Sequence, residues 1–205
     1  MTDQEKIFSA AERTLQAFTI EAEALLMQHK VLCSNTVAQA AGMLATASVI
    51  GASACGHTGI SCMHFAHLMC CIGKPARFIP PSEAVHGGLG FLQPGSVMLL
   101  ASRGGRTTEL LPIQTYCKDH HVKTIVVTEN TDSVLARDAD LLLPIVVNRE
   151  TDKYNSQGTT SFIVMSAVFD VLQTAMIEII GFTNEQFAAI HPGGAVGARL
   201  NGGSS

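Results

Sequence analysis

The chain is poor in aromatic and charged residues. Its 205 residues contain no tryptophan and two tyrosines, and charged residues make up 15% of the sequence against 47% for hydrophobic residues. This composition excludes an intrinsically disordered chain, which needs low hydrophobicity and high charge. The length suits a single domain with a sizeable buried core. We therefore expect one domain over residues 1–200, followed by a flexible Gly/Ser tail at 201–205.

Positive charge is scarce as well. The sequence has 13 Lys and Arg against 17 Asp and Glu, a formal net charge of -4. Such a balance gives no general attraction to nucleic acid or to an anionic membrane. Glycine, histidine and lysine interrupt the richest apolar stretch between residues 51 and 74, so we expect no membrane-spanning run. The sequence thus predicts a soluble protein with no nucleic-acid partner and no membrane partner.

Export signals and cysteine-pairing motifs are missing too. The polar N-terminus lacks the basic flank and apolar centre of a secretory signal. The six cysteines show no CxxC spacing, and their neighbours are apolar. We expect reduced, buried thiols without a disulfide framework, in a cytoplasmic protein.

The hydrophobic pattern changes from helical to strand-like near residue 47. Apolar side chains recur at helical spacing from residue 4 to about residue 43, which predicts N-terminal helices within residues 1–46. Short apolar runs typical of buried strands follow at residues 47–51, 76–79, 97–101, 124–128 and 141–147. Stretches with helical spacing separate these runs.

This alternation predicts an α/β fold over residues 47–200, with a doubly wound, mostly parallel five-stranded sheet and helices on both faces. After the last strand, residues 159–180 form a long apolar helix that ends at Gly181, and Thr183 or Asn184 begins a further short helix. Ligands of such sheets bind beyond the carboxyl ends of the strands. The loops at those ends are therefore the places to search for functional residues.

The first predicted strand leads through small residues, 51–59, into a helix. Free backbone N–H groups and the helix dipole at such a turn favour an anion, with phosphate the obvious candidate. The spacing is neither that of a P-loop nor that of a dinucleotide-binding turn. The alternative is a tight strand–helix turn that simply needs small residues. The candidate phosphate ligands of this turn are Ser53, Cys55, Gly56 and His57.

The third predicted strand ends in Ser-Arg-Gly-Gly-Arg-Thr-Thr-Glu, residues 102–109, which we call the phosphate loop. It combines hydroxyl donors, guanidinium charge and glycines that let a ligand approach the backbone. Its candidate phosphate ligands are Ser102, Arg103, Arg106, Thr107 and Thr108. Either threonine alternatively caps the next helix. Glu109 is a base acting on another part of the ligand, or a first-turn acid that complements the helix dipole.

Two further titratable residues lie in polar or glycine-rich segments. Glu150 follows the fifth predicted strand, and His191 precedes the Pro-Gly-Gly-Ala-Val-Gly segment that ends at residue 197. We expect Glu109, Glu150 and His191 to converge at the strand ends, where His191 moves protons. The alternative for His191 is a structural histidine hydrogen-bonded to backbone.

The segment 62–71 carries His64, His67, Cys70 and Cys71 at helical spacing. These residues could bind a metal ion, but Met, Leu, Phe and Ala surround them. Core packing is the better interpretation, and we expect no metal site.

The motifs together resemble the sugar isomerase (SIS) domain family, and within it the arabinose 5-phosphate isomerases. The resemblance covers residues 45–200 and rests on five segments, 51–59, 82–90, 102–109, Glu150 with the Thr-rich residues after it, and 191–197. It implies the SIS fold and interconversion of an aldose phosphate and a ketose phosphate through an enediol, with no cofactor. It also assigns the phosphate to the Ser/Thr-rich loop and proton handling to Glu109, Glu150, His86 and His191.

The resemblance further implies a homo-oligomer, either a dimer or a tetramer, with sites near the subunit boundaries. The apolar N-terminal helices offer a surface for such an assembly. Many members carry a regulatory pair of C-terminal CBS domains, and this sequence is expected to represent the catalytic domain alone.

Two positions depart from the family pattern. Ala54 stands where the family has a lysine, and the phosphate loop reads Ser-Arg-Gly-Gly-Arg in place of Ser-Asn-Ser-Gly-Glu. Arg103 or Arg106 replaces the lost charge in our interpretation, although arginine and lysine hold an anion differently. Two alternatives stay open: a non-catalytic phosphosugar sensor, and an isomerase for a different sugar phosphate.

Overall fold

The computed structural model describes residues 2–201, so four of the five residues in the predicted flexible tail lie outside the described residues. Its five strands form one parallel sheet in the order β2-β1-β3-β4-β5. The strands are β1 (Ile50–Ser53), β2 (Ala76–Phe78), β3 (Val97–Ala101), β4 (Lys123–Thr128) and β5 (Leu141–Pro144). The predicted doubly wound α/β fold is therefore confirmed.

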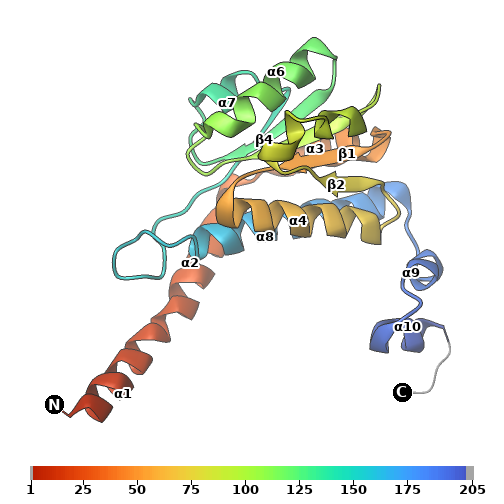
Figure 1. The fold of residues 1–205 in the computed structure, drawn as a ribbon. Helices are drawn as coiled ribbons and strands as arrows, with labels where there is room; N and C mark the ends of the chain where they lie inside the picture. The colour runs from red at the N-terminus through yellow and green to blue at the C-terminus, as the bar shows by residue number, and fades with distance from the viewer. Residues whose placement is uncertain (1, 202–205) are drawn as a thin grey trace.

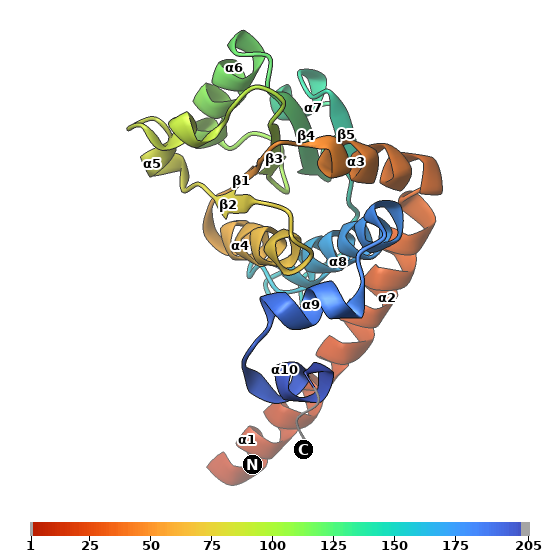
Figure 2. The same ribbon diagram turned by 90° about the vertical axis from the view of Figure 1, so that its right-hand side faces the viewer.

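Helices cover both faces of the sheet, as Figures 1 and 2 show. The helices of the first face are α2 (Gln16–Val31), α3 (Ser34–Thr46), α4 (Gly56–Cys71) and α8 (Thr160–Ile180). The elements of the second face are α5 (Pro81–Ala84), η1 (Gly88–Phe91), η2 (Thr108–Leu110), α6 (Leu111–Asp119) and α7 (Val134–Arg137). Along β3, Leu99 packs into the first core and Leu100 into the second. A strand buried on both sides has to be apolar at every position, which explains the continuous hydrophobic runs.

The predicted N-terminal helical region is three helices, which break at Leu15 and again at Leu32 and Cys33. The first, α1 (Asp3–Thr14), buries no residue and projects away from the sheet in Figure 1. Its apolar side chains continue along the outer side of α2 as a row of exposed residues. They are Ile7, Phe8, Leu15, Phe18 and Leu26, each more than 60% exposed. An apolar row of this size is typical of a surface that another chain covers.

The first strand begins three residues later than predicted. Ala47 follows α3 as its C-cap, and pairing with β2 and β3 starts at Ile50. Gly51 is therefore in the strand and not in the turn. A methyl group there would lie 2.5 Å from Sδ of Met98 and 3.0 Å from Leu92, so glycine permits close packing against the neighbouring strand.

The fifth strand ends earlier than predicted, at Pro144. Ile145 still donates its N–H to the carbonyl of Thr128, at 3.0 Å. Side chains then replace the strand partner, because Gln28 accepts the N–H of Val146 at 2.8 Å and Glu129 accepts that of Val147 at 3.2 Å. Periodicity could not reveal this, since the competing acceptors come from other parts of the chain.

The helices after the sheet match the prediction and add one. Helix α8 ends at Gly181, whose φ of 63° is left-handed, and Thr183 caps α9 (Asn184–Ile190) with a capping box. The glycine-rich segment beyond His191 forms this further helix, α10 (Gly194–Leu200), which the sequence did not predict. Figures 1 and 2 show α10 apart from the sheet.

The expectation that no apolar run could span a membrane is wrong for α8. This helix of 21 residues has a mean hydropathy of 1.8 over its most apolar window, which satisfies the length and composition of a span. One such helix is weak evidence, because a core helix passes the same test. In the fold α8 packs against α2, α3 and α4, and Val164, Phe169 and Leu172 belong to the first core.

Candidate functional site

The loops that follow β1 and β3 lie side by side at the carboxyl edge of the sheet. The chain leaves β1 toward β2 on one side and returns as β3 on the other, so this is the point where the strand order reverses. Doubly wound sheets bind their ligands in the crevice at such a point. Burial raises the pKa of the Cys55 thiol in the first loop, and the negative charge of Glu109 in the second raises it further. The two predicted loops therefore lie together at this edge and make up one candidate site.

The turn after β1 directs the N-terminus of α4 into this site. Cys55 is the N-cap and makes no side-chain capping bond, so the first N–H groups of the helix have no capping acceptor there. These groups and the dipole of a 16-residue helix favour an anion. Ser53 does not add to them, because its buried hydroxyl donates to the carbonyl of Ile79 at 2.7 Å.

The phosphate loop is closed by its own side chains. The Ser102 hydroxyl accepts the N–H of Gly105 at 3.0 Å and lies 2.8 Å from the Thr107 hydroxyl. Thr107 is the N-cap residue of η2, but its side chain makes no capping hydrogen bond. Its hydroxyl therefore stabilises the loop through Ser102 and does not cap the helix. Within residues 2–201, Arg106 makes no hydrogen bond or ion pair, and it is exposed. It is the loop cation that is free to meet a ligand.

Gly105 fixes the shape of this loop. Its φ is 65°, and a methyl group there would run into the side chain of Ser133. We expect Gly105→Ala to lower the free energy of unfolding by about 2–4 kcal/mol, from backbone strain and overpacking together. Gly104→Ala is the matched control, because nothing lies within 4 Å of its added methyl group. Chemical unfolding checks both variants, and equal losses would contradict the account.

Arg103 points to carboxylates and not to open space. Its Nε donates to Oε2 of Glu129 at 2.9 Å, and its Nη1 donates to Oε1 of Glu150 at 2.6 Å. Glu150 is 1% exposed, whereas the side chains of Arg103 and Glu129 are about one-third exposed, at 35% and 34%. Arg103 thus joins the ends of β3, β4 and β5. Sequence reasoning missed Glu129, although its place directly after the fourth predicted strand was a usable signal.

The other carboxylate, Glu109, is exposed and accepts one hydrogen bond, from the Thr108 hydroxyl at 3.1 Å. Its charge acts on the Cys55 thiol, so it lies near the turn after β1. His86 follows α5 beyond the carboxyl end of β2, the edge strand next to β1. Its N–H donates to the carbonyl of Glu83 at 3.1 Å, but its imidazole is exposed and, among the described residues, makes no hydrogen bond or ring contact.

His191 does not converge with the carboxylates, contrary to the prediction. Its Nε2 lies 3.7 Å from Sγ of Cys71, at the far end of α4. A helix of 16 residues is about 22 Å long, so His191 lies that far from the site in its own chain. The reason is local: α9 carries His191 back to this end, where its ring stacks on Phe187 at 3.9 Å between centroids. Its buried Nδ1 has no partner within residues 2–201, so a structural bond to backbone does not explain it.

Two of the four histidines and cysteines named on α4 contact each other, since Sγ of Cys71 lies 3.5 Å from Nε2 of His67, and the other two have separate partners. His64 pairs with Asp170 at 3.1 Å, while Cys70 donates to the carbonyl of Ala76 at 3.4 Å. Among residues 2–201, no group of three or more His, Cys, Asp or Glu side chains could hold a metal ion. All six cysteines are free, with Cys33 and Cys70 exposed rather than buried as predicted.

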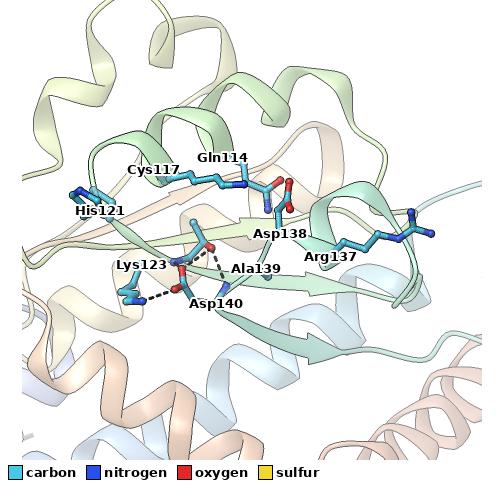
Figure 3. Close-up of a pocket in the computed structure, with 11 residues that line it drawn as sticks. Gln114, Cys117, His121, Lys123, Arg137, Asp138, Ala139 and Asp140 are labelled. Atoms are coloured by element: carbon cyan, nitrogen blue, oxygen red, sulfur yellow. Dashed lines mark hydrogen bonds and ion pairs between the residues drawn. The ribbon is translucent and has the colours of Figure 1, made fainter.

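A pocket of about 460 Å³ lies at the opposite, amino-terminal edge of the sheet, where β4 and β5 begin (Figure 3). Asp140 in its wall accepts hydrogen bonds from Lys123 Nζ at 2.6 Å and from the N–H of Thr124 at 2.8 Å. Burial alone would raise the pKa of Asp140, but these bonds lower it below its ordinary value. Asp140 therefore ties the starts of two strands together.

This carboxylate makes stability depend on pH. Because its pKa is lower in the folded state, its contribution is present above the ordinary value of 3.8 and is lost as pH falls through the folded value. We expect Asp140→Asn to cost about 1–2 kcal/mol of unfolding free energy at pH 7, with a smaller difference below pH 3.8. Urea titrations at both pH values check this. Asp138→Asn, in the same pocket, is the control, and an equal loss there would contradict the assignment.

Comparison with known proteins identifies the family. Residues 43–175 match the family model described as SIS domain. The chain belongs to the SIS domain family. Among curated relatives, arabinose 5-phosphate isomerase KdsD of Pseudomonas aeruginosa is 36% identical over 152 residues, which cover 74% of this chain and 46% of the relative. KpsF of Escherichia coli, with the same enzyme name, is 39% identical over 128 residues, covering 62% of this chain and 40% of that protein.

This SIS domain chain thus spans less than half the length of the curated relatives it matches. Solved structures match it more fully. A Listeria monocytogenes protein, named provisionally as a sugar-phosphate isomerase, has a TM-score of 0.88 and 34% identity, and the match covers 94% of this chain and 100% of that one. An Escherichia coli CFT073 protein in complex with arabinose 5-phosphate has a TM-score of 0.82, 25% identity and the same two coverages.

Proposed function

We propose that this SIS domain is a phosphosugar isomerase that interconverts an aldose phosphate and a ketose phosphate, with arabinose 5-phosphate and ribulose 5-phosphate as the first pair to test. One observation carries the proposal: the exposed carboxylate of Glu109 lies beside a helix N-terminus and a hydroxyl-rich loop, at the reversal point of the sheet. An anion site next to an accessible base suits a phosphorylated substrate that has to lose a carbon-bound proton. The relatives named arabinose 5-phosphate isomerase and the neighbour bound to arabinose 5-phosphate support the substrate class.

The phosphate is held by the first turn of α4 and by the phosphate loop. Gly56 and His57 offer backbone N–H groups, while Thr107, Thr108 and the guanidinium of Arg106 complete the ligand set. Ser102 supports the loop from its buried position. Arg106 supplies the positive charge that the family lysine would bring at Ala54, because Ala54 is 2% exposed and offers none.

Glu109 is the base of the proposed reaction. Of the two predicted carboxylates it is the accessible one, and Glu150 is enclosed. Glu109 takes the proton from the carbon next to the aldehyde, which leaves an enediolate, and returns it to the former aldehyde carbon to give the ketose. A second proton moves between the two oxygens, for which a neutral imidazole is suited. The reaction transfers no electrons to another molecule and uses no cofactor.

The imidazole comes from a second copy of the chain. His191 lies about 22 Å from the site of its own chain, judged by the length of α4. It precedes α10, which stands apart from the sheet in Figure 2. We therefore propose a homo-oligomer, a dimer or a tetramer, in which His191 enters the partner's site. The exposed apolar row on α1 and α2 supplies contact area, and His86, at the open edge of the site, is a further proton-handling candidate.

Substrate profiling tests the function. Purified protein is incubated with pentose, hexose and heptose phosphates, and the aldose and ketose forms are followed by NMR. We expect arabinose 5-phosphate to be converted to ribulose 5-phosphate. Conversion of a longer sugar alone would keep the reaction and replace the substrate, whereas no conversion of any sugar would contradict an isomerase.

The absence of a cation at Ala54 favours a second candidate function, a non-catalytic phosphosugar sensor. A sensor would bind the sugar phosphates without converting them. The same panel separates the two functions when each sugar is also tested for thermal stabilisation of the protein. We propose a cytoplasmic location, which the six free cysteines support.

A further inference from the structure

We infer that Arg103, Glu129 and Glu150 form a charge cluster that positions the wall of the substrate site, and that Glu150 is a positioning residue and not the base. The inference rests on the proposed function, whose base is Glu109. The two arginines of the phosphate loop then have different roles. Arg106 binds the phosphate, and Arg103 positions the wall of the site.

Glu150 is bound in a way that leaves it little capacity for chemistry. Its Oε1 accepts from Arg103 at 2.6 Å, and its Oε2 accepts from the Thr159 hydroxyl at 3.2 Å and from the N–H of Ser161 at 3.1 Å. A carboxylate offers about four lone-pair sites, so three of them are in use. With 1% exposure, Glu150 is also closed to a substrate. Glu150 therefore acts as an anchor for the segments that contact it.

The charge of the cluster argues against phosphate binding by Arg103. One guanidinium faces two carboxylates, Glu129 at 2.9 Å and Glu150 at 2.6 Å, which leaves the cluster with a net charge of -1. The remaining Nη2 turns toward the carbonyl of Val147, at 3.4 Å. A phosphate dianion approaching Arg103 would meet two like charges, while Arg106 nearby has no competing partner among the described residues.

The anchored segment is the wall of the anion site. Glu150 fixes the start of α8 through Ser161, and its own N–H donates to Asn155 at 2.6 Å. Between them, the loop passes directly over the turn after β1, since a methyl group on Gly158 would lie 3.0 Å from Nδ1 of His57. Arg103 and Glu129 thus act on the substrate through Glu150 and this loop. Arg103 departs from the family pattern, and this departure has a structural role: its guanidinium neutralises the buried carboxylate of Glu150.

Variants of the pair distinguish an anchor from a base. We expect Arg103→Met to lower the melting temperature, on the order of 10 °C, since it leaves the buried carboxylate of Glu150 without its cation. Glu150→Gln should lower it as well, because a neutral amide accepts the bonds from Arg103 and Ser161 more weakly than a carboxylate does. We expect both variants to raise KM for arabinose 5-phosphate at least about tenfold while kcat and its pH profile change little. The double variant R103M/E150Q is expected to recover part of both losses, because the buried charge and its cation are both removed and only Glu129, which is one-third exposed, stays charged. Arg103→Lys should lower the melting temperature less than Arg103→Met does, because lysine keeps the positive charge.

If Glu150 were the base, removing Arg103 could not restore the activity that Glu150→Gln loses. If R103M/E150Q and Glu150→Gln both lose kcat as fully as Glu109→Gln, Glu150 is the base and the inference is overturned. If Arg103→Met raises KM without changing the melting temperature, Arg103 binds phosphate and the inference also fails. Should the wild-type protein convert no sugar, the same variants are compared by calorimetric Kd for arabinose 5-phosphate. A weaker Kd that the double variant restores then supports the cluster, and an unchanged Kd overturns it.

Discussion

Replacing Glu109 by glutamine is expected to lower kcat by about 10²–10⁴-fold, the usual contribution of a general base. The amide keeps the size of the carboxylate but cannot take a proton. KM should change much less, because the phosphate is held by other groups. Initial rates of ketose formation across a range of sugar phosphate concentrations measure both constants.

The control for this variant is Asp138→Asn, the same chemical change at the opposite edge of the sheet. It should leave kcat and KM at their wild-type values. A second consequence concerns Cys55, whose thiol pKa is raised partly by the charge of Glu109. Glu109→Gln should therefore speed its alkylation at pH 8, and an unchanged rate together with full turnover would remove Glu109 from the site.

Mixing two inactive variants is expected to restore activity. If His191 completes the partner's site, His191→Ala and Glu109→Gln each inactivate every site in their own oligomers. In a mixed dimer, one of the two sites receives Glu109 from one chain and His191 from the other. Random exchange of subunits makes half of the dimers mixed, so the mixture should reach about one quarter of the wild-type rate.

The matched control mixes the Glu109→Gln protein with the Arg106→Met protein. Both substitutions lie in the part of the site that one chain supplies. Each mixed dimer then has no site with both residues intact in the same chain, and the mixture should stay at the level of the single variants. Recovery in this control, or none with His191→Ala, would contradict a site shared between copies. Sedimentation velocity gives the required evidence that subunits are associated during the assay.

Much of the fold could be predicted because its signals are local. Strands buried on both faces are apolar at every position, and the five runs marked all five strands of the sheet. The C-terminal end of α8 and the start of α9 follow from Gly181 and Thr183, whose effects operate within one turn. The boundaries that failed depend on distant partners: Gln28 and Glu129 end β5, and packing against Met98 places Gly51 inside β1.

The candidate site was predictable to the same extent. Placing polar residues after apolar runs found the turn at 54–57, the phosphate loop and Glu150, because parallel strands bring their carboxyl ends together. The same rule could not say that Arg103 turns to Glu150, since the direction of a long side chain depends on the charges around it. Nor could it place His191, which lies after the last strand and follows the path of α9.

Proton exchange with solvent is the most direct test of enediol chemistry at this site. The wild-type protein is incubated in D2O with arabinose 5-phosphate, and deuterium at the carbon next to the aldehyde is followed by NMR, alongside Glu109→Gln. We predict that the wild type incorporates deuterium there and that the variant does not. Thermal stabilisation by the sugar phosphate without any exchange would contradict the account, because the site would then bind its ligand and perform no chemistry.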